Sequence, residues 1–114
     1  MLKKMDIGGG NNTAGHYGGS FTPSTSEYTA LTCDFAPTKV ILWQSYGNSN
    51  MDVAEYVVSE GKAYEWYQGS SKRNYNATLT SFFSVAADGT VSFKPGGTNP
   101  SQWVQQTWWV AIKE

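Results

Sequence analysis

The sequence contains few charged residues, one cysteine and one histidine, and each of these shortages argues against a class of site. Among the 114 residues, Cys33 is the single cysteine and His16 the single histidine. A lone cysteine cannot form an internal disulfide, so we interpret Cys33 as a small buried hydrophobe. Zinc needs several His, Cys or carboxylate ligands, and a cysteine nucleophile needs a positioned base. We therefore expect no metal, no cofactor and no catalytic Cys–His pair.

Charged residues make up 15% of the chain, and eight basic residues nearly balance nine acidic ones. This balance gives no basic surface, so we expect no nucleic-acid partner. No run approaches the ~20 apolar residues that span a bilayer, so we expect no membrane partner. The start, Met1–Asp6, is basic, but no apolar region of a secretory signal follows it. We therefore expect no secretion signal.

The acidic residues do not form a catalytic pattern. A glycosidase holds two carboxyl groups ~5–9 Å apart across a sugar. The nine carboxylates are scattered, and pairs such as Asp52/Glu55 have no spacing that demands such a site. Most isolated acids lie on solvated surfaces. The sequence therefore predicts a protein that is not an enzyme.

Aromatic residues are abundant, with five Trp, seven Tyr and five Phe. Trp and Tyr combine a flat apolar ring with a polar edge, which suits stacking on sugars or anchoring a protein interface. Trp43 and one of Trp108 and Trp109 are predicted to lie in the core. Four other aromatics flank polar loops and are the predicted ligand-binding residues: Tyr46, Trp66, Tyr67 and Trp103.

The strongest apolar run, residues 38–45, is predicted to be the strand around which the chain is organised. Successive strand residues point to opposite faces, so Val40 and Leu42 face one way and Ile41 and Trp43 the other. Both faces are apolar, which predicts a central strand covered on both sides.

Further strands are predicted at 16–17, 27–33, 53–59, 63–68, 76–86, 91–93 and 103–113. Residues 51–60 also fit a helix, but their β-branched and aromatic content favours a strand. The Asp88–Gly89 pair between two apolar runs predicts a hairpin. About eight short strands separated by turn residues predict an all-β fold, an antiparallel, jelly-roll-like β-sandwich. We expect residues 1–13 to be a flexible lead and 14–114 a single domain.

Two stretches resemble tail-associated proteins of bacteriophages and prophages of Gram-positive bacteria. The first combines Gly15-His-Tyr-Gly-Gly with the later Phe35-Ala-Pro-Thr-Lys-Val-Ile-Leu-Trp, and is similar to a glycine–aromatic opening followed by a Phe-x-Pro strand. The second, Thr107-Trp-Trp-Val-Ala-Ile, resembles the aromatic–aliphatic close of those domains. The resemblance carries no catalytic motif.

The resemblance implies a non-enzymatic tail-fibre or baseplate domain that contacts other tail proteins and forms a homo-oligomer such as a homotrimer. It places the protein in the virion, outside the cell after phage release. Loops near 46–52, 69–75 and 95–103 are rich in aromatic and amide groups, so we expect them to bind a cell-wall saccharide. Two alternatives stay open: a free-standing, lectin-like carbohydrate-binding domain and, more distantly, a small cell-wall glycan hydrolase.

Overall fold

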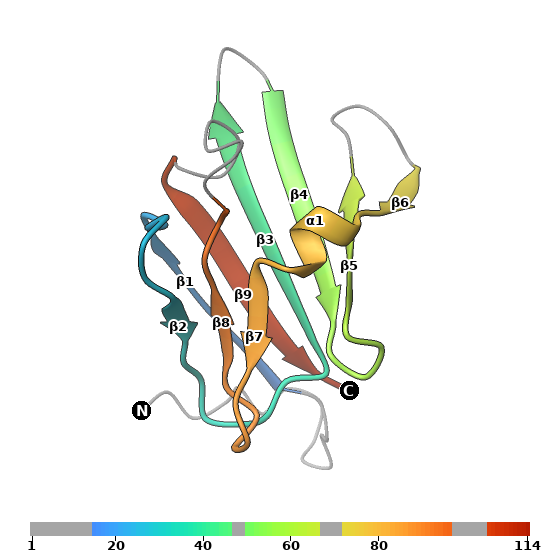
Figure 1. Cartoon of the computed structure of the whole chain (residues 1–114). Coiled ribbons are helices and arrows are strands. Elements are labelled where there is room, and N and C mark those ends of the chain that lie inside the picture. The colour runs from blue at the N-terminus through green and yellow to red at the C-terminus, as the bar shows by residue number, and fades with distance from the viewer. Residues whose placement is uncertain (1–14, 47–49, 67–71, 97–104) are drawn as a thin grey trace.

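The computed structural model describes residues 15–46, 50–66, 72–96 and 105–114. In them, antiparallel strands form two sheets, and one short helix connects two strands (Figure 1). The elements are β1 (Gly15–Phe21), β2 (Thr29–Leu31), β3 (Lys39–Tyr46), β4 (Asn50–Val57), β5 (Lys62–Trp66), β6 (Arg73–Tyr75), α1 (Ala77–Thr80), β7 (Phe83–Val85), β8 (Val91–Phe93) and β9 (Thr107–Lys113). The predicted all-β sandwich architecture is confirmed. The predicted lead at 1–13 lies outside the described residues.

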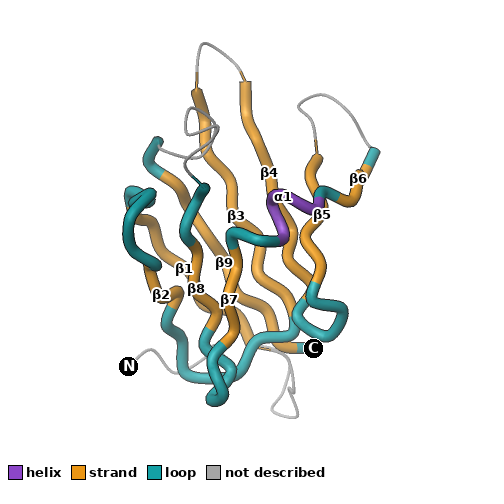
Figure 2. Tube along the Cα trace, viewed as in Figure 1, coloured by secondary structure: helices purple, strands orange, loops and turns teal. Residues whose placement is uncertain are grey.

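The larger sheet has six strands in the order β1-β9-β3-β4-β5-β6, and the smaller has three in the order β2-β8-β7. The smaller sheet lies over one face of the larger, with loops joining the layers (Figure 2). β3 pairs with β4 on one side and with β9 on the other. The prediction that this strand is central is therefore correct, and the last described strand lies beside it.

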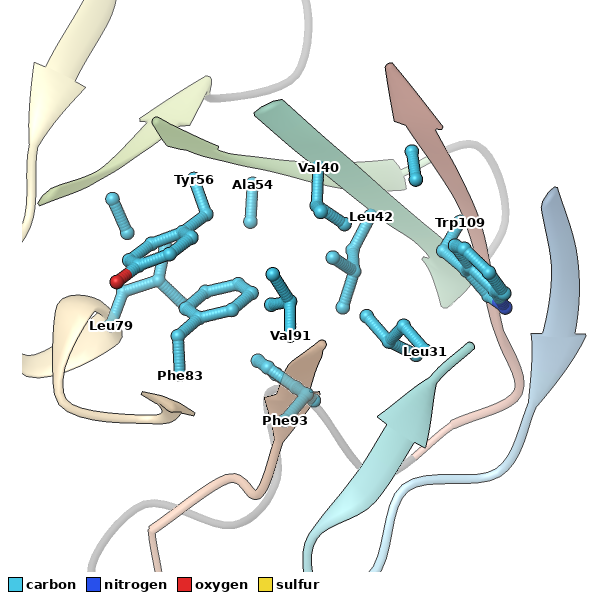
Figure 3. Close-up of a cluster of buried hydrophobic side chains, with 12 residues drawn as sticks. Leu31, Val40, Leu42, Ala54, Tyr56, Leu79, Phe83, Val91, Phe93 and Trp109 are labelled. Atoms are coloured by element: carbon cyan, nitrogen blue, oxygen red, sulfur yellow. The ribbon is translucent and has the colours of Figure 1, made fainter. Parts of the chain in front are cut away.

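The core lies between the two sheets. Val40 and Leu42 of β3 have no exposed surface, and they face Val91 and Phe93 of β8 (Figure 3). Fully burying a side chain of this size stabilises the fold by about 1.5–3 kcal/mol. The Tyr56 and Phe83 rings also stack across the layers, with centroids 4.5 Å apart. The alternation predicted for residues 38–45 thus places one set of side chains in the core.

β1 continues through Gly18 and Gly19, where the sequence predicted that the first strand would end. The reason is the close approach of β9. A Cβ at Gly18 would lie 2.6 Å from the Trp109 carbonyl oxygen, and one at Gly19 would lie 3.3 Å from Trp109 Nε1. Glycine in a strand marks such close approach of backbone or ring. These glycines admit a neighbouring strand instead of ending their own.

The long strand predicted at 76–86 is wrong in its first half, where the chain forms α1. The Asn76 side chain accepts a hydrogen bond from Leu79 N–H at 2.9 Å, which caps the helix at its first turn. Leu79 turns into the core from this helix. Only Phe83–Val85 remain as strand β7. In the described part of the chain, no helix is long and apolar enough to cross a membrane.

Other strand bounds differ from prediction at their ends. The strand predicted at 27–33 is reduced to β2, and β9 begins at Thr107. Residues Arg73–Tyr75, predicted as part of a loop, pair with β5 as β6. Asn50–Asp52, also placed in a loop, begin β4. Short polar segments of this kind have little strand pattern, so their pairing depends on the neighbouring strand.

The hairpin predicted at Asp88–Gly89 is confirmed, β4 and β5 form a second hairpin, and the strand interpretation of residues 51–60 is also confirmed. Gly61 has φ +65° between β4 and β5, and Gly89 has φ +91° between β7 and β8. Positive φ is strained for other residues, which explains glycine at both turns. The β-branched and aromatic residues of β4 outweighed the helical spacing.

Candidate functional site

The candidate site is the face of the six-stranded sheet that points away from the smaller sheet, called here the outer face. Because strand side chains alternate, the residues between the core positions all project to this face. The antiparallel register arranges those whose side chains the structure describes in three rows across the strands. The first row is Ser20, Trp108, Trp43, Val53, Trp66 and Arg73. The second is Gly18, Val110, Ile41, Glu55, Tyr64 and Tyr75. The third is His16, Ile112, Lys39, Val57 and Lys62.

Three of the five tryptophans of the chain occupy the first row, called here the tryptophan row. Trp108 and Trp43 are on neighbouring strands, and Val53 separates Trp43 from Trp66. Strands lie about 4.8 Å apart, so the row extends roughly 14 Å from Trp108 to Trp66. Trp108 is 38% exposed, and Trp43 and Trp66 are half-buried. Ring surface is therefore available along the row.

The prediction that β3 is fully covered on both sides is wrong for its outer side. Ile41 and Trp43 keep part of their surface exposed, whereas Val40 and Leu42 have none. Trp43 is therefore not a core residue, contrary to the sequence-based prediction. Of the other two candidates, Trp109 is the buried one, at 8% exposure. The outer face is thus a second hydrophobic surface of the six-stranded sheet. The described residues of the smaller sheet do not cover it.

A carboxylate lies at the centre of this apolar face. Glu55 Oε2 is 3.2 Å from Lys39 Nζ, and Glu55 Oε1 accepts a hydrogen bond from Arg73 Nε at 2.9 Å. Trp66 Nε1 donates a longer one, at 3.4 Å, to the same oxygen. The Glu55 side chain is 10% exposed, while those of Lys39 and Arg73 are 30% and 37% exposed. These contacts fix the orientation of Trp66 relative to the cations.

The charge state of Glu55 follows from these contacts. Burial acts to raise the pKa of Glu55, but hydrogen bonds and charge from Arg73 and Lys39 outweigh it and lower the pKa below its ordinary value. The same hydrogen bond to Glu55 raises the pKa of Arg73. Glu55 is therefore ionised at neutral pH. The two cations, each about a third exposed, retain N–H donors for a ligand.

An aromatic group next to Arg73 completes the β5–β6 side of the face. The Arg73 guanidinium carbon lies 3.6 Å from the centroid of the Tyr64 ring, a cation–π contact. Tyr64 packs edge-on to Tyr75 with centroids 6.0 Å apart. The Tyr64 hydroxyl donates to Glu60 Oε1 at 2.6 Å, which raises the pKa of Tyr64. Arg73 is thus held from two directions, by a carboxylate and by a ring.

Of the four predicted ligand-binding residues, the structure describes the side chain of Trp66 alone. Trp66 lies in the tryptophan row and is half-buried. Tyr46 is the last residue of β3, and its side chain lies outside the described part of the structure. Tyr67 and Trp103 lie outside the described residues. The site residues missed were Trp43, Trp108 and Glu55; their alternation with core residues was visible, but not which face stayed uncovered.

The inner face of the same sheet ends in a buried polar layer near the β3–β4 connection. Thr107, Gln44 and Asp52 are opposite one another on β9, β3 and β4. Gln44 Nε2 donates to Asp52 Oδ2 at 3.4 Å, and Gln44 Oε1 accepts from the Gln105 N–H at 3.4 Å. Buried polar groups that are hydrogen-bonded avoid the cost of desolvation. This layer closes the core at that end.

Glu65, one strand further along, is also buried on the inner face and accepts from Asn76 Nδ2 at 2.9 Å. Asn76 therefore links the β5 carboxylate to the cap of α1. Within the described residues, no group of three His, Cys, Asp or Glu side chains is placed to hold a metal ion.

Comparison of the chain with known proteins gives no relative from which a role could be transferred. No protein-family model matches it, and neither a curated protein nor a solved structure does. The outer face and the resemblance of the sequence to tail-associated proteins are therefore the features that bear on function.

Proposed function

We propose that this chain is a non-enzymatic saccharide-binding module of a phage or prophage tail, and that it binds through the outer face of its six-stranded sheet. The observation that carries the proposal is the tryptophan row. Trp108 and Trp43 lie on neighbouring strands of one apolar sheet face, and Trp66 lies in the same row beyond Val53. Exposed apolar surface gathered into one patch marks an interaction site, whereas scattered apolar residues do not.

The chemistry of the face favours a sugar chain over a wholly apolar partner. A pyranose ring has a C–H face that packs on an aromatic ring, and a rim of hydroxyls that needs hydrogen-bonding groups. Arg73 and Lys39 supply such donors beside the tryptophan row, and Glu55 holds both. Because the row extends roughly 14 Å, an extended oligosaccharide fits it better than one monosaccharide.

The tail setting depends on the resemblance of residues 15–43 and 107–112 to tail-associated proteins of Gram-positive phages. In that setting the saccharide is a component of the host cell wall, and other tail proteins are the protein partners. The sheet scaffold is rigid, which suits a module that presents its site at the end or side of a fibre.

Binding of labelled protein to intact Gram-positive cells and to purified wall polysaccharides tests the proposal. We expect saturable binding that free polysaccharide competes, and a weakening of about tenfold for Trp108→Ala and Trp66→Ala. The matched control is Tyr28→Ala, which removes an aromatic side chain that is 48% exposed but lies outside the six-stranded sheet. Unchanged binding by both tryptophan variants, or no binding across a broad panel, would refute the proposed role.

A further inference from the structure

β1 forms an edge of the six-stranded sheet, and it is the longest edge strand in the described structure. It has seven residues, whereas the other edge strands, β2, β6 and β7, have three each. One side of β1 pairs with β9. Among the described residues, no backbone hydrogen bond outside that ladder involves β1. With respect to the described residues, its other side therefore presents a row of backbone N–H and C=O groups.

This edge has none of the features that usually prevent strand pairing. Natural edges are blocked by charged side chains, proline, bulges or short length. β1 contains no Lys, Arg, Asp, Glu or Pro, and its register with β9 is unbroken over all seven residues. His16, Gly18, Gly19 and Ser20 are exposed. Such an edge is a template for one more strand.

We propose that the occupant is β1 of a second copy of this chain, paired antiparallel about a two-fold axis at Gly18. The sequence of the strand is complementary to itself in this register. Tyr17 then lies opposite Gly19 of the second copy, and Phe21 opposite Gly15. Each aromatic side chain is thus opposite a glycine, so no bulky side chain opposes it across the strands. The inner side of each glycine is already covered within its own chain, Gly19 by Trp109 and Gly15 by Phe35.

The register also keeps the two faces of the sheet continuous. Opposed residues in antiparallel strands point to the same side, so Tyr17 and Phe21 stay in the inner layer. Tyr17 already packs on Trp109, with ring centroids 5.9 Å apart, and Phe21 on Phe93, at 6.3 Å. On the outer face, His16 lies opposite Ser20 of the second copy. The contact is symmetric and therefore closes at two chains.

The test uses the exposed pair His16 and Ser20, because their substitution leaves the core intact. In His16→Lys/Ser20→Lys, a lysine faces a lysine at both symmetric positions, which destabilises the pairing. In His16→Lys/Ser20→Glu, each lysine faces a glutamate of the second copy. Thr78→Lys/Ala87→Lys adds the same charge as the first variant at exposed positions away from β1. Circular dichroism checks that each variant is folded.

Mass in solution is measured by light scattering after size-exclusion chromatography. We expect twice the 12.5 kDa of one chain for the wild type, for the lysine–glutamate variant and for the control. We expect one chain for the double-lysine variant, and a return to two when it is mixed with His16→Glu/Ser20→Glu. A monomeric or trimeric wild type, or a folded double-lysine variant that stays dimeric, would overturn the proposal.

Discussion

Trp43 of β3 lies directly opposite Trp108 of β9, and both belong to the outer face of the six-stranded sheet. One position along, Leu42 lies opposite Trp109 on the inner face. Two adjacent tryptophans in the sequence therefore have different surroundings. Trp109 is buried in the core, whereas Trp108 is 38% exposed on the side that we propose binds saccharide.

This difference predicts opposite effects for two neighbouring substitutions. Trp109→Ala should lower the free energy of unfolding by about 3–5 kcal/mol, because it leaves a cavity beside Tyr17 and over Gly19. Trp108→Ala should lower it by less, about 1–2 kcal/mol, because 38% of the Trp108 surface is already exposed in the folded chain. Urea unfolding followed by circular dichroism measures both. Equal losses would mean that the two faces are equally buried, contrary to the structure.

Glu55→Gln should make stability less sensitive to acid. The pKa of Glu55 is lowered in the folded chain, so its carboxylate stabilises the fold above the pKa of an unfolded glutamate, about 4.3. That stabilisation is lost as the pH falls through the lower folded pKa. We expect the wild type to exceed the variant by about 1–2 kcal/mol at neutral pH, and by much less in strong acid.

Urea unfolding across the acid range gives this difference at each pH. The control is Glu27→Gln, which changes an exposed glutamate in a loop and should alter the free energy of unfolding by less than about 0.5 kcal/mol. A difference for Glu55→Gln that stays constant into acid would show that the ion pairs do not stabilise the fold.

Asn76 has two roles that two substitutions can separate. Its Oδ1 caps α1 through the Leu79 N–H, and its Nδ2 donates to Glu65. Asn76→Ala removes both bonds and should cost about 1–2 kcal/mol. Asn76→Asp keeps the cap but places a second carboxylate beside the buried Glu65. Its loss of stability should therefore be greatest at neutral pH and shrink in acid, as one carboxyl becomes protonated. A pH-independent loss would contradict the Glu65 contact.

Two turn glycines should respond differently to alanine. At Gly61, φ is +65° and a Cβ would meet nothing within 4 Å, so the cost is that of the left-handed conformation, about 1 kcal/mol. At Gly89, φ is +91° and a Cβ would lie 2.7 Å from the Ala36 Cβ. Gly89→Ala should therefore cost about 2–3 kcal/mol. Thermal unfolding ranks the two variants, and the reverse order would be inconsistent with the turn geometry.

The sequence predicted the parts of the fold that depend on strong local patterns. The apolar run at 38–45, the Asp88–Gly89 turn and the β-branched content of β4 each specify their element. Where the deciding factor was a distant neighbour, the prediction failed. The Gly18–Gly19 pair predicts the end of a strand. The glycines are instead required by the close approach of Trp109, ninety positions later. The α1 cap likewise depends on one asparagine within a strand-like stretch.

The sequence led to the kind of site that we propose, but not to its position. The abundance of tryptophan indicated a binding surface, and Trp66 was among the residues chosen. The alternation along β3 and β9 could be read from the sequence, but the size of the smaller sheet could not. Because the smaller sheet lies over one face of the larger, no described strand covers the other apolar face, and Trp43, predicted to be a core residue, is only half-buried there.

The position of β9 has a consequence for synthesis. Among the described strands it is the last to be made, yet it lies between β1 and β3 in the sheet. A nascent chain that has emerged as far as Phe93 can form the β3–β4–β5–β6 ladder and the smaller sheet. β1 then has no ladder partner in the described structure, and one side of β3 is open. The larger sheet is therefore completed only after β9 has been made, by contacts that are distant in the sequence and form slowly. Until then, the apolar edge of β3 is the surface that a chaperone would need to protect.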